Sequence, residues 1–399
     1  MTGIKKIALA YSGGLDTSVA IKWLADKYNA KIITVTVDLG QGEDLKGIGE
    51  KALKVGAENH YTIDCVDEFA KSYIFPSVKA NGLYQGKYPI STSLGRPLIA
   101  RKLVEIAHKE GCDAVAHGCT GKGNDQLRIE ISAKALDPKL TMLAPTRNWG
   151  MSRDQEIEYA SKYGIPVSKA AKKYSIDENI WGRSIESGPL ENPWTSPTED
   201  GWELTKSPES APDKPMELEI GFKSGVPVSV DGKKMDPVAL IKHIGKVAGE
   251  NGVGRIDHME DRIVGIKSRE TYECPSALPI IEAHKDLEKL ILNRHELSFK
   301  KMVDDQWTFM VYAGLWEDPL REDLDAFIDK TSERVDGRVK VKLYKGSMIV
   351  TGRESPFSVY DFKTATYDSS STFDQTLSNG FVPLWGLPTV VSRKVMAKK

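Results

Sequence analysis

A short loop near the start of the chain carries the residue types that hold phosphate. Its sequence, S-G-G-L-D-T-S at residues 12–18, follows an apolar run that predicts a strand and precedes one that predicts a helix. Glycines let oxygens approach the backbone, hydroxyls donate hydrogen bonds, and a helix N-terminus attracts anions. No Lys-Ser or Lys-Thr pair closes the loop, and the G-x-G-x-x-G spacing is absent, which excludes a Walker-type loop and a dinucleotide-binding turn. The loop therefore predicts phosphate binding by backbone amides and hydroxyls.

Asp16 is an unusual residue for an anion site, because a bare carboxylate repels phosphate. It fits such a site if a Mg²⁺ ion lies between the carboxylate and the phosphate. In the alternative interpretation, Asp16 and Thr17 only cap the following helix while Gly13 and Gly14 form a tight turn. The complete string after a buried strand favours phosphate binding, with Asp16 organising Mg²⁺.

A second segment, residues 117–128, combines a strand end, several glycines and polar side chains. Asn124 or Asp125 is expected to cap a helix, and Arg128 lies one turn further on the same face as Asn124. Such side chains suit carboxylate and amide groups. In the alternative interpretation this is a capped helix with a solvated Lys122 and Arg128, but the density of glycines favours a ligand site. We expect His117 to be structural rather than a catalytic base, because it ends a buried strand.

Alternating strand and helix patterns over the first ~170 residues position both segments in a parallel sheet covered on both faces. Because ligands bind outside the carboxyl ends of such strands, the loops after Ala10, Val37 and His117 should meet in one crevice. The predicted strands are 5–10, 31–38, 60–63, 113–117 and 140–144, and the predicted helices are 19–24, 43–55, 67–79, 96–110, 125–136 and 152–163.

The composition changes after Pro166, and the second half predicts an α+β domain. Residues 193–215 are rich in proline and predict a long extended connection. The predicted hairpins are 217–222 with 226–230 and 338–343 with 348–351, and the predicted helices are 236–251, 286–301 and 319–335. The last ~35 residues are too apolar for a free tail, so they either pack on a neighbouring subunit or fold back on their own chain.

Charge and cysteine usage exclude several classes of function. The formal net charge of −1 over 399 residues gives no reason to expect nucleic acid or an acidic membrane as partner. The four cysteines contain no C-x-x-C pair, which favours reduced thiols over a metal site or disulfides. No apolar run is long enough to span a bilayer and no signal peptide is recognisable, so we expect a soluble, cytoplasmic protein.

The motifs together resemble the argininosuccinate synthase family of the ATP pyrophosphatase superfamily. Besides the loop, the resemblance rests on STSLGRP at 91–97, HGCTGKGNDQLR at 117–128, YSIDENIWGRS at 174–184 and VGIKSRETYE at 264–273, and it runs from about residue 5 to beyond residue 360. It implies an α/β protein with an N-terminal parallel-sheet nucleotide-binding domain (1–170) of the ATP pyrophosphatase type, an α+β synthetase domain (171–362) and a C-terminal oligomerisation arm (363–399) of a homotetramer.

The resemblance also implies ligands for individual residues. ATP would be held by Ala10, Tyr11, Ser12, Gly13, Gly14, Leu15, Asp16, Thr17, Ser18, Val37 and Gly118. Citrulline would be held by Tyr88, Ser93, Asn124, Arg128, Ser175, Ser184, Glu260 and Tyr272. Aspartate would be held by Thr120, Asn124 and Asp125. Asp261, next to Glu260, offers an adjacent carboxylate.

The implied reaction joins citrulline and aspartate through a citrullyl-adenylate and releases AMP and pyrophosphate. Asp16 and Asp125 are the predicted catalytic residues: Asp16 would organise Mg²⁺, and Asp125 would accept a proton from the aspartate amine, a role that released phosphate oxygens could equally fill. One alternative is another ATP pyrophosphatase. A tRNA-modifying enzyme of this kind should have a basic face, which the net charge of −1 does not favour. A glutamine-dependent amide-forming enzyme needs a nucleophilic cysteine, commonly near the N-terminus, and no cysteine precedes Cys65. A second alternative is a nucleotide sensor that has lost the chemistry.

Overall fold

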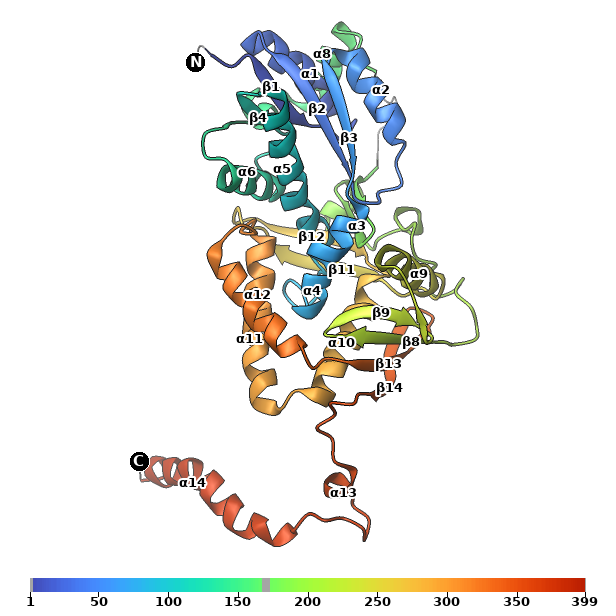
Figure 1. The fold of residues 1–399 in the computed structure, drawn as a ribbon, viewed down its shortest axis with the longest axis vertical. Coiled ribbons are helices and arrows are strands. Elements are labelled where there is room, and N and C mark those ends of the chain that lie inside the picture. The colour runs from blue at the N-terminus through green and yellow to red at the C-terminus, as the bar shows by residue number, and fades with distance from the viewer. Residues whose placement is uncertain (1–2, 167–172, 399) are drawn as a thin grey trace. The chain divides into compact units, whose positions relative to one another are not determined.

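The computed structural model describes residues 3–166 and 173–398. The chain divides after Phe357 into a large compact unit and a short C-terminal unit. Within the large unit, the N-terminal part is built on a parallel sheet with strand order β3-β2-β1-β4-β5 (Figure 1). Its strands are β1 (Lys6–Ala10), β2 (Lys31–Asp38), β3 (Asn59–Asp64), β4 (Ala114–Ala116) and β5 (Thr141–Leu143). The predicted parallel α/β fold is confirmed.

Alternate residues of the central strand are buried on opposite faces of this sheet. Ile7 and Leu9 of β1 pack in one apolar cluster with Leu24 of α1, whereas Ala8 packs in another with Leu98 of α5. Burial on both faces is the usual environment of a parallel sheet. The helices of this part are α1 (Leu15–Tyr28), α2 (Leu45–Val55), α3 (Val66–Phe69), a π-helical stretch (Ala70–Ile74), α4 (Phe75–Lys79), α5 (Ser91–Glu110), α6 (Asp125–Leu136), α7 (Pro145–Asn148) and α8 (Arg153–Lys162).

Helix α5 begins five residues before the predicted start at residue 96. Pro97 lies inside the helix, where proline normally weakens or kinks it. The first turns persist because Ser91, Ser93 and Leu94 are buried against the rest of the large unit. Tertiary packing therefore overrides the local stop signal and places Ser93 and Arg96 on one regular helix.

The second part of the large unit contains two antiparallel sheets, with orders β10-β9-β8-β13-β14 and β11-β12-β7-β6. The predicted α+β organisation and both predicted hairpins are confirmed. Helices α3 and α4 contact helices of this part (Figure 1). Its strands are β6 (Ser175–Asn179), β7 (Gly182–Glu186), β8 (Met216–Lys223), β9 (Val226–Val230), β10 (Lys233–Lys234), β11 (Arg255–Asp261), β12 (Lys267–Glu273), β13 (Gly337–Tyr344) and β14 (Ser347–Glu354).

The helices of the second part are α9 (Pro237–Glu250), α10 (Ala277–Ile291), α11 (Arg294–Tyr312) and α12 (Pro319–Ser332), with 3₁₀ turns at Gly188–Glu191 and Glu199–Gly201. The single helix predicted over 286–301 was wrong. Helix α10 ends at Ile291. The side chain of Asn293 accepts hydrogen bonds from the backbone N–H groups of His295 and Glu296 and so caps the start of α11. Apolar periodicity continued across this capping box and concealed the boundary.

The C-terminal unit consists of α13 (Phe362–Ala365), a 3₁₀ turn (Gln375–Leu377) and α14 (Ser378–Met396). Side chains of α14 such as Leu384 and Trp385 are exposed, at 73% and 69%. Among the residues described, no helix is long and apolar enough to cross a membrane.

Candidate active site

The loop after β1 leaves the N-terminus of α1 without a side-chain cap. Gly13 has a φ of +75°, and Gly14 occupies the cap position of α1 without a side-chain hydrogen bond. The hydroxyls of the loop bond to one another: Tyr11 Oη lies 3.1 Å from Ser18 Oγ, and Ser12 Oγ lies 3.3 Å from Thr17 Oγ1. Asp16 and Thr17 therefore do not cap the helix as the alternative interpretation required. The arrangement suits an anion at the helix N-terminus.

Asp16 contacts two charged or ionisable side chains of α8. Its Oδ1 accepts a hydrogen bond from Arg153 Nη1 at 2.8 Å. Burial and the neighbouring carboxyl of Asp16 raise the pKa of Glu156 to about 8. Among the described residues there is no group of three metal-ligating acids, cysteines or histidines. The oxygen donors at this point fit a Mg²⁺ ion only if phosphate oxygens complete its coordination, which is how Mg²⁺ is commonly bound.

The loop after β4 lies directly against the phosphate loop. A Cβ added to Gly118 would come within 2.6 Å of Thr17 Cγ2, so only glycine fits this contact. Val37 is buried near the carboxyl end of β2, which is parallel to β1. The predicted meeting of these strand ends is thus confirmed (Figure 1). His117 is buried between the Cys119 N–H and Glu130 Oε1, as expected of a structural histidine.

Asn124, one of the two residues predicted to cap α6, occupies the N-cap position, but its side chain makes no hydrogen bond to the helix. Its Oδ1 instead accepts a hydrogen bond from the backbone N–H of Ile263 at 3.0 Å. Arg262 Nη1 donates to the carbonyl of Lys122 at 3.3 Å. The glycine-containing loop, which also carries the exposed Thr120, is therefore tied to the turn between β11 and β12. The side-chain oxygen of Asn124, which local geometry would use to cap the helix, is therefore taken up by a long-range contact.

Asp125 lies between two arginines. Arg96 Nη2 and Arg128 Nη1 each donate to its carboxylate at 2.8 Å, and Arg96 also pairs with Asp177. Burial pushes the pKa of Asp125 upward, but the two guanidinium groups outweigh it and hold the pKa down to about 2. A carboxylate this acidic is a poor proton acceptor at neutral pH. The contacts therefore do not favour Asp125 as a general base.

Tyrosines surround a buried carboxylate beside Arg128. The hydroxyls of Tyr272 and Tyr312 donate to Glu260 at 2.7 and 2.6 Å, and Glu260 is 4% exposed. Burial raises the pKa of Glu260 against the effect of these two hydrogen bonds. Tyr88 stacks on Tyr272 with ring centres 4.0 Å apart. Tyr84 stacks on Tyr312 in the same way, at 3.5 Å.

The structure distinguishes Glu260 from its neighbour Asp261. Asp261 pairs with Lys267 at 2.6 Å and accepts a hydrogen bond from Gln85, and its side chain is half exposed. Successive residues of a strand point to opposite faces, which places Glu260 alone among the tyrosines.

The three serines predicted at the site differ in their surroundings. Ser93 is fully buried, and its hydroxyl has no hydrogen-bond partner within the described part of the chain. Ser184 lies opposite Tyr272 across β7 and β12. Ser175 is exposed at the start of β6, opposite Glu186. Ser91 Oγ, on the same helix as Ser93, is likewise buried without a hydrogen-bond partner among the described residues.

Two models of one protein family match almost the whole chain. "Arginosuccinate synthase N-terminal HUP domain" matches residues 6–166, and "Arginosuccinate synthase C-terminal domain" matches residues 174–392. The chain belongs to the argininosuccinate synthase family. The argininosuccinate synthase of Pyrococcus furiosus is 54% identical over 98% of this chain and 95% of its own length. The argininosuccinate synthase of Geobacillus kaustophilus is 55% identical over 97% of this chain and 95% of its own length. That of Bacillus licheniformis is 52% identical over 100% of this chain and 99% of its own length.

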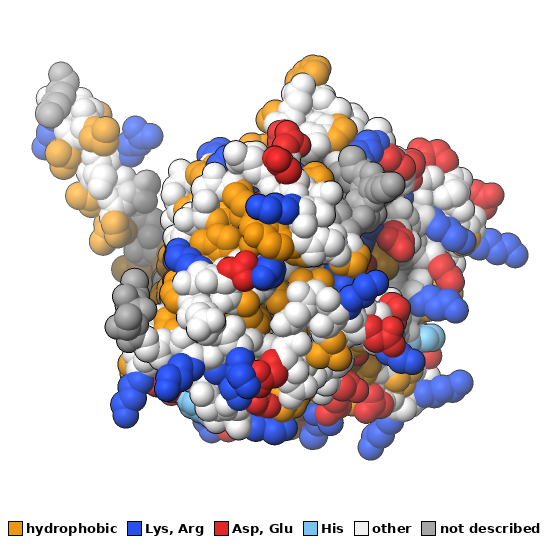
Figure 2. Space-filling model, turned by 90° about the horizontal axis from the view of Figure 1, so that it is seen from above, with side chains coloured by type: hydrophobic (Ala, Val, Ile, Leu, Met, Phe, Trp, Pro, Cys, Tyr) orange, Lys and Arg blue, Asp and Glu red, His pale blue; other side chains and the backbone are white. Residues whose placement is uncertain are grey.

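This relationship decides among the alternatives left by the sequence. The activity is that of an argininosuccinate synthase, an AMP-forming ligase that uses ATP. A tRNA-modifying enzyme, a glutamine-dependent amide former and a nucleotide sensor are set aside. On the face seen in Figure 2, basic and acidic side chains are interspersed.

Several residues that contact the predicted site residues were missed by sequence reasoning. Arg96 and Asp177 lie inside the quoted motifs, so those motifs already contained the signal for them. Tyr84 and Tyr312 lie outside every motif, and only their contacts with one another and with Glu260 reveal them. Lys51 of α2, whose Nζ donates to the Gly13 carbonyl at 2.7 Å, was also missed.

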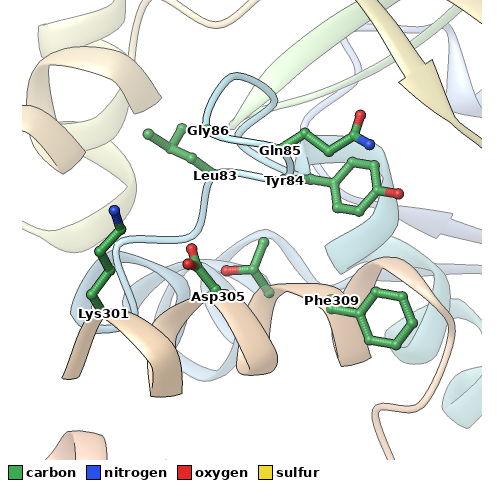
Figure 3. A pocket seen from close by; sticks show the side chains of 8 residues that line it. Leu83, Tyr84, Gln85, Gly86, Lys301, Asp305 and Phe309 are labelled. Atoms are coloured by element: carbon green, nitrogen blue, oxygen red, sulfur yellow. The ribbon is translucent and has the colours of Figure 1, made fainter. Parts of the chain in front are cut away.

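A hollow of about 370 Å³ lies between the turn at 83–86 and α11 (Figure 3). It is lined by Leu83, Tyr84, Gln85, Gly86, Lys301, Asp305, Thr308 and Phe309. None of the predicted ligand residues is among them.

Proposed function

We propose that this site binds ATP, citrulline and aspartate together and joins the two amino acids through a citrullyl-adenylate. The observation that carries the proposal is that one glycine-rich segment contacts both groups of predicted ligand residues. Gly118 lies against Thr17 of the α1 loop, and Asp125 of the same segment pairs with Arg128, which bonds to the Tyr312 carbonyl beside Glu260. A phosphate site and an amino-acid site are thus adjacent within one compact unit.

On the nucleotide side, the segment 10–18 with Val37 and Gly118 would bind ATP. The backbone amides of the loop and the hydroxyls of Ser12, Thr17 and Ser18 would hold the pyrophosphate. Asp16 would hold Mg²⁺, with Arg153 giving up its present hydrogen bond to the carboxylate. Bound Mg²⁺ would neutralise charge on the leaving pyrophosphate.

On the citrulline side, the donor set matches the three polar groups of the substrate. Glu260 supplies a carboxylate for the ammonium group, and Arg128 a cation for the carboxylate. Neutral donors, among them the Ser93 hydroxyl, remain for the ureido group. Tyr88, Asn124, Ser175, Ser184 and Tyr272 complete the proposed citrulline set, with Ser175 the least supported because it is exposed.

On the aspartate side, we propose Thr120, Asn124 and Asp125, with Asn124 shared between the two amino acids. Asp125 would act by fixing Arg96 and Arg128 rather than by accepting a proton. The proton of the aspartate amine would then pass to a phosphate oxygen of the adenylate or the released pyrophosphate. This revises the base role predicted for Asp125.

The reaction would proceed in two displacements that the protein promotes by holding reactants in line. The ureido oxygen of citrulline attacks the α-phosphorus of ATP, and the bond to pyrophosphate breaks. The aspartate amine then attacks the ureido carbon of the adenylate, and the carbon–oxygen bond to AMP breaks. Adenylation is needed because a ureido carbon is a poor electrophile with a poor leaving group.

A product assay tests this proposal. Purified protein with ATP and Mg²⁺ is expected to produce AMP and pyrophosphate over many turnovers only when citrulline and aspartate are both present. Omitting either amino acid, or replacing citrulline with ornithine, serves as the control. ADP as the product, or AMP release without amino acids, would refute the proposal.

We further propose that residues 363–399 join subunits into a homotetramer, which the exposed apolar side chains of α14 support. Gel filtration of the full 44.1 kDa chain is expected to give a tetramer, and removal of residues 363–399 a smaller species. The single substitution Trp194→Ser, at another exposed aromatic residue, should leave the size unchanged. An unchanged tetramer after the truncation would contradict this role.

A further inference from the structure

The proposed pyrophosphate loop contains no basic residue of its own. Residues 10–18 carry one charged side chain, the carboxylate of Asp16. A helix N-terminus supplies only about half of a positive charge, whereas pyrophosphate leaves with several negative charges. Loops of the Walker type solve this problem with a lysine that reaches the β- and γ-phosphates. Besides the proposed Mg²⁺, any positive charge supplied by a side chain has to come from another part of the chain.

Helix α2 places a lysine against the loop. Lys51 Nζ donates to the carbonyl oxygen of Gly13 at 2.7 Å, although 38 residues separate the two in sequence. Ile48, one turn earlier on the same face of α2, lies 3.0 Å from the position a Cβ would take at Gly13. An apolar and a basic side chain spaced by three residues thus contact the same glycine.

The rest of α2 keeps Lys51 in this position. Asp44 caps the helix by accepting a hydrogen bond from the Gly47 N–H at 3.0 Å. Ala52, the neighbour of Lys51, is fully buried in the apolar cluster that also contains Ile21 of α1. The helix is therefore fixed both to α1 and to the loop that precedes it. Lys51 itself is half-buried, so its charge is less screened than that of an exposed lysine.

We propose that Lys51 binds the pyrophosphate group of ATP and stabilises it as it leaves. A lysine ammonium carries three donors and a compact charge, which suits a phosphate oxygen at the Gly13 turn. The loop would then obtain from a neighbouring helix the cation that a Walker loop carries within itself. This inference rests on the proposed assignment of residues 10–18 to pyrophosphate.

Isothermal titration with Mg²⁺-pyrophosphate and, separately, with AMP tests this role without turnover. The variant Lys51→Ala is expected to bind pyrophosphate about 10- to 100-fold more weakly, the loss typical of one charge-assisted hydrogen bond, while its affinity for AMP stays within about twofold. Lys51→Arg should recover most of the pyrophosphate affinity. Lys54→Ala, at an exposed lysine on the same helix, should match the wild type.

The outcomes separate this inference from the proposed function. Wild-type protein that binds AMP but no pyrophosphate would overturn the assignment of the loop and the role of Lys51 with it. Wild-type protein that binds pyrophosphate, with Lys51→Ala binding it equally well, would overturn the role of Lys51 alone. An equal loss of AMP and pyrophosphate affinity in Lys51→Ala would show that the lysine only shapes the loop, and would also overturn the inference.

Discussion

Replacing Asp16 with alanine is expected to lower turnover by roughly 10²- to 10³-fold, the usual cost of losing one group that stabilises transition-state charge. The protein should still fold, because Asp16 lies on the first turn of α1 with a side chain one-third exposed. Its contribution to helix stability there is about 0.3–1 kcal/mol. Steady-state kinetics across a range of Mg²⁺ concentrations, with circular dichroism to verify the fold, would measure the effect.

Two further variants make this test specific. Asp16→Asn keeps the size of the side chain and an oxygen for Arg153, but removes the charge, so it should lose nearly as much turnover as alanine. Asp26→Asn removes a carboxylate from the other end of α1, where it pairs with Lys22 at 2.6 Å, and should have little effect. A turnover near the wild-type value for Asp16→Ala at ordinary Mg²⁺ would eliminate the proposed role.

Replacing Arg128 with alanine is expected to raise the KM for citrulline about 10- to 150-fold and to leave the KM for ATP nearly unchanged. The magnitude corresponds to a hydrogen bond with a charged group, about 1.5–3 kcal/mol. Arg128 is 5% exposed, donates to Asp125 and to the Tyr312 carbonyl, and lies 4.8 Å from the centre of the Tyr312 ring. Kinetics with citrulline varied at saturating ATP and aspartate would measure the change.

Because Arg128 also joins α6 to the end of α11, its loss could destabilise the fold. Arg128→Lys keeps the positive charge but not the fork of donors, so it should fold well and still show a raised KM for citrulline. Arg101→Ala, which breaks an arginine–glutamate pair between α5 and Glu317, provides a control with normal citrulline dependence. Unchanged citrulline dependence in both Arg128 variants would reject the assignment.

The phosphate loop shows how much local sequence can predict. Although α1 begins at Leu15, four residues before the predicted start at residue 19, strand, glycine turn and helix follow one another within residues 6–28 as predicted. The same holds for β4, the glycine-rich loop and α6. The parallel sheet follows from the alternation of such units, because right-handed strand–helix–strand connections leave few other arrangements.

The partners of the key polar groups could not be predicted in this way. Local rules assigned Asn124 or Asp125 to the cap of α6; Asn124 occupies that position, but its side chain bonds to Ile263, 139 residues away. Asp125 was predicted as a base. Burial raises its pKa, but the hydrogen bonds and charges of Arg96 and Arg128 outweigh this effect and lower the pKa to about 2. Periodicity also ran through Asn293 and merged two helices into one. For Asn124 and Asp125, contacts formed by tertiary packing outweighed the local pattern, whereas at Asn293 a local capping box ended one helix and began the next.

The sequence by itself therefore determined the kind of chemistry. Its motifs specified a phosphate loop without an internal lysine, a second glycine-rich segment and membership of an adenylating ligase family. The tertiary structure alone decided which residues act together, because hydrogen bonds and charge pairs depend on distance in space. It selected Glu260 over Asp261, placed Tyr84 and Tyr312 beside it, and brought Lys51 to the phosphate loop.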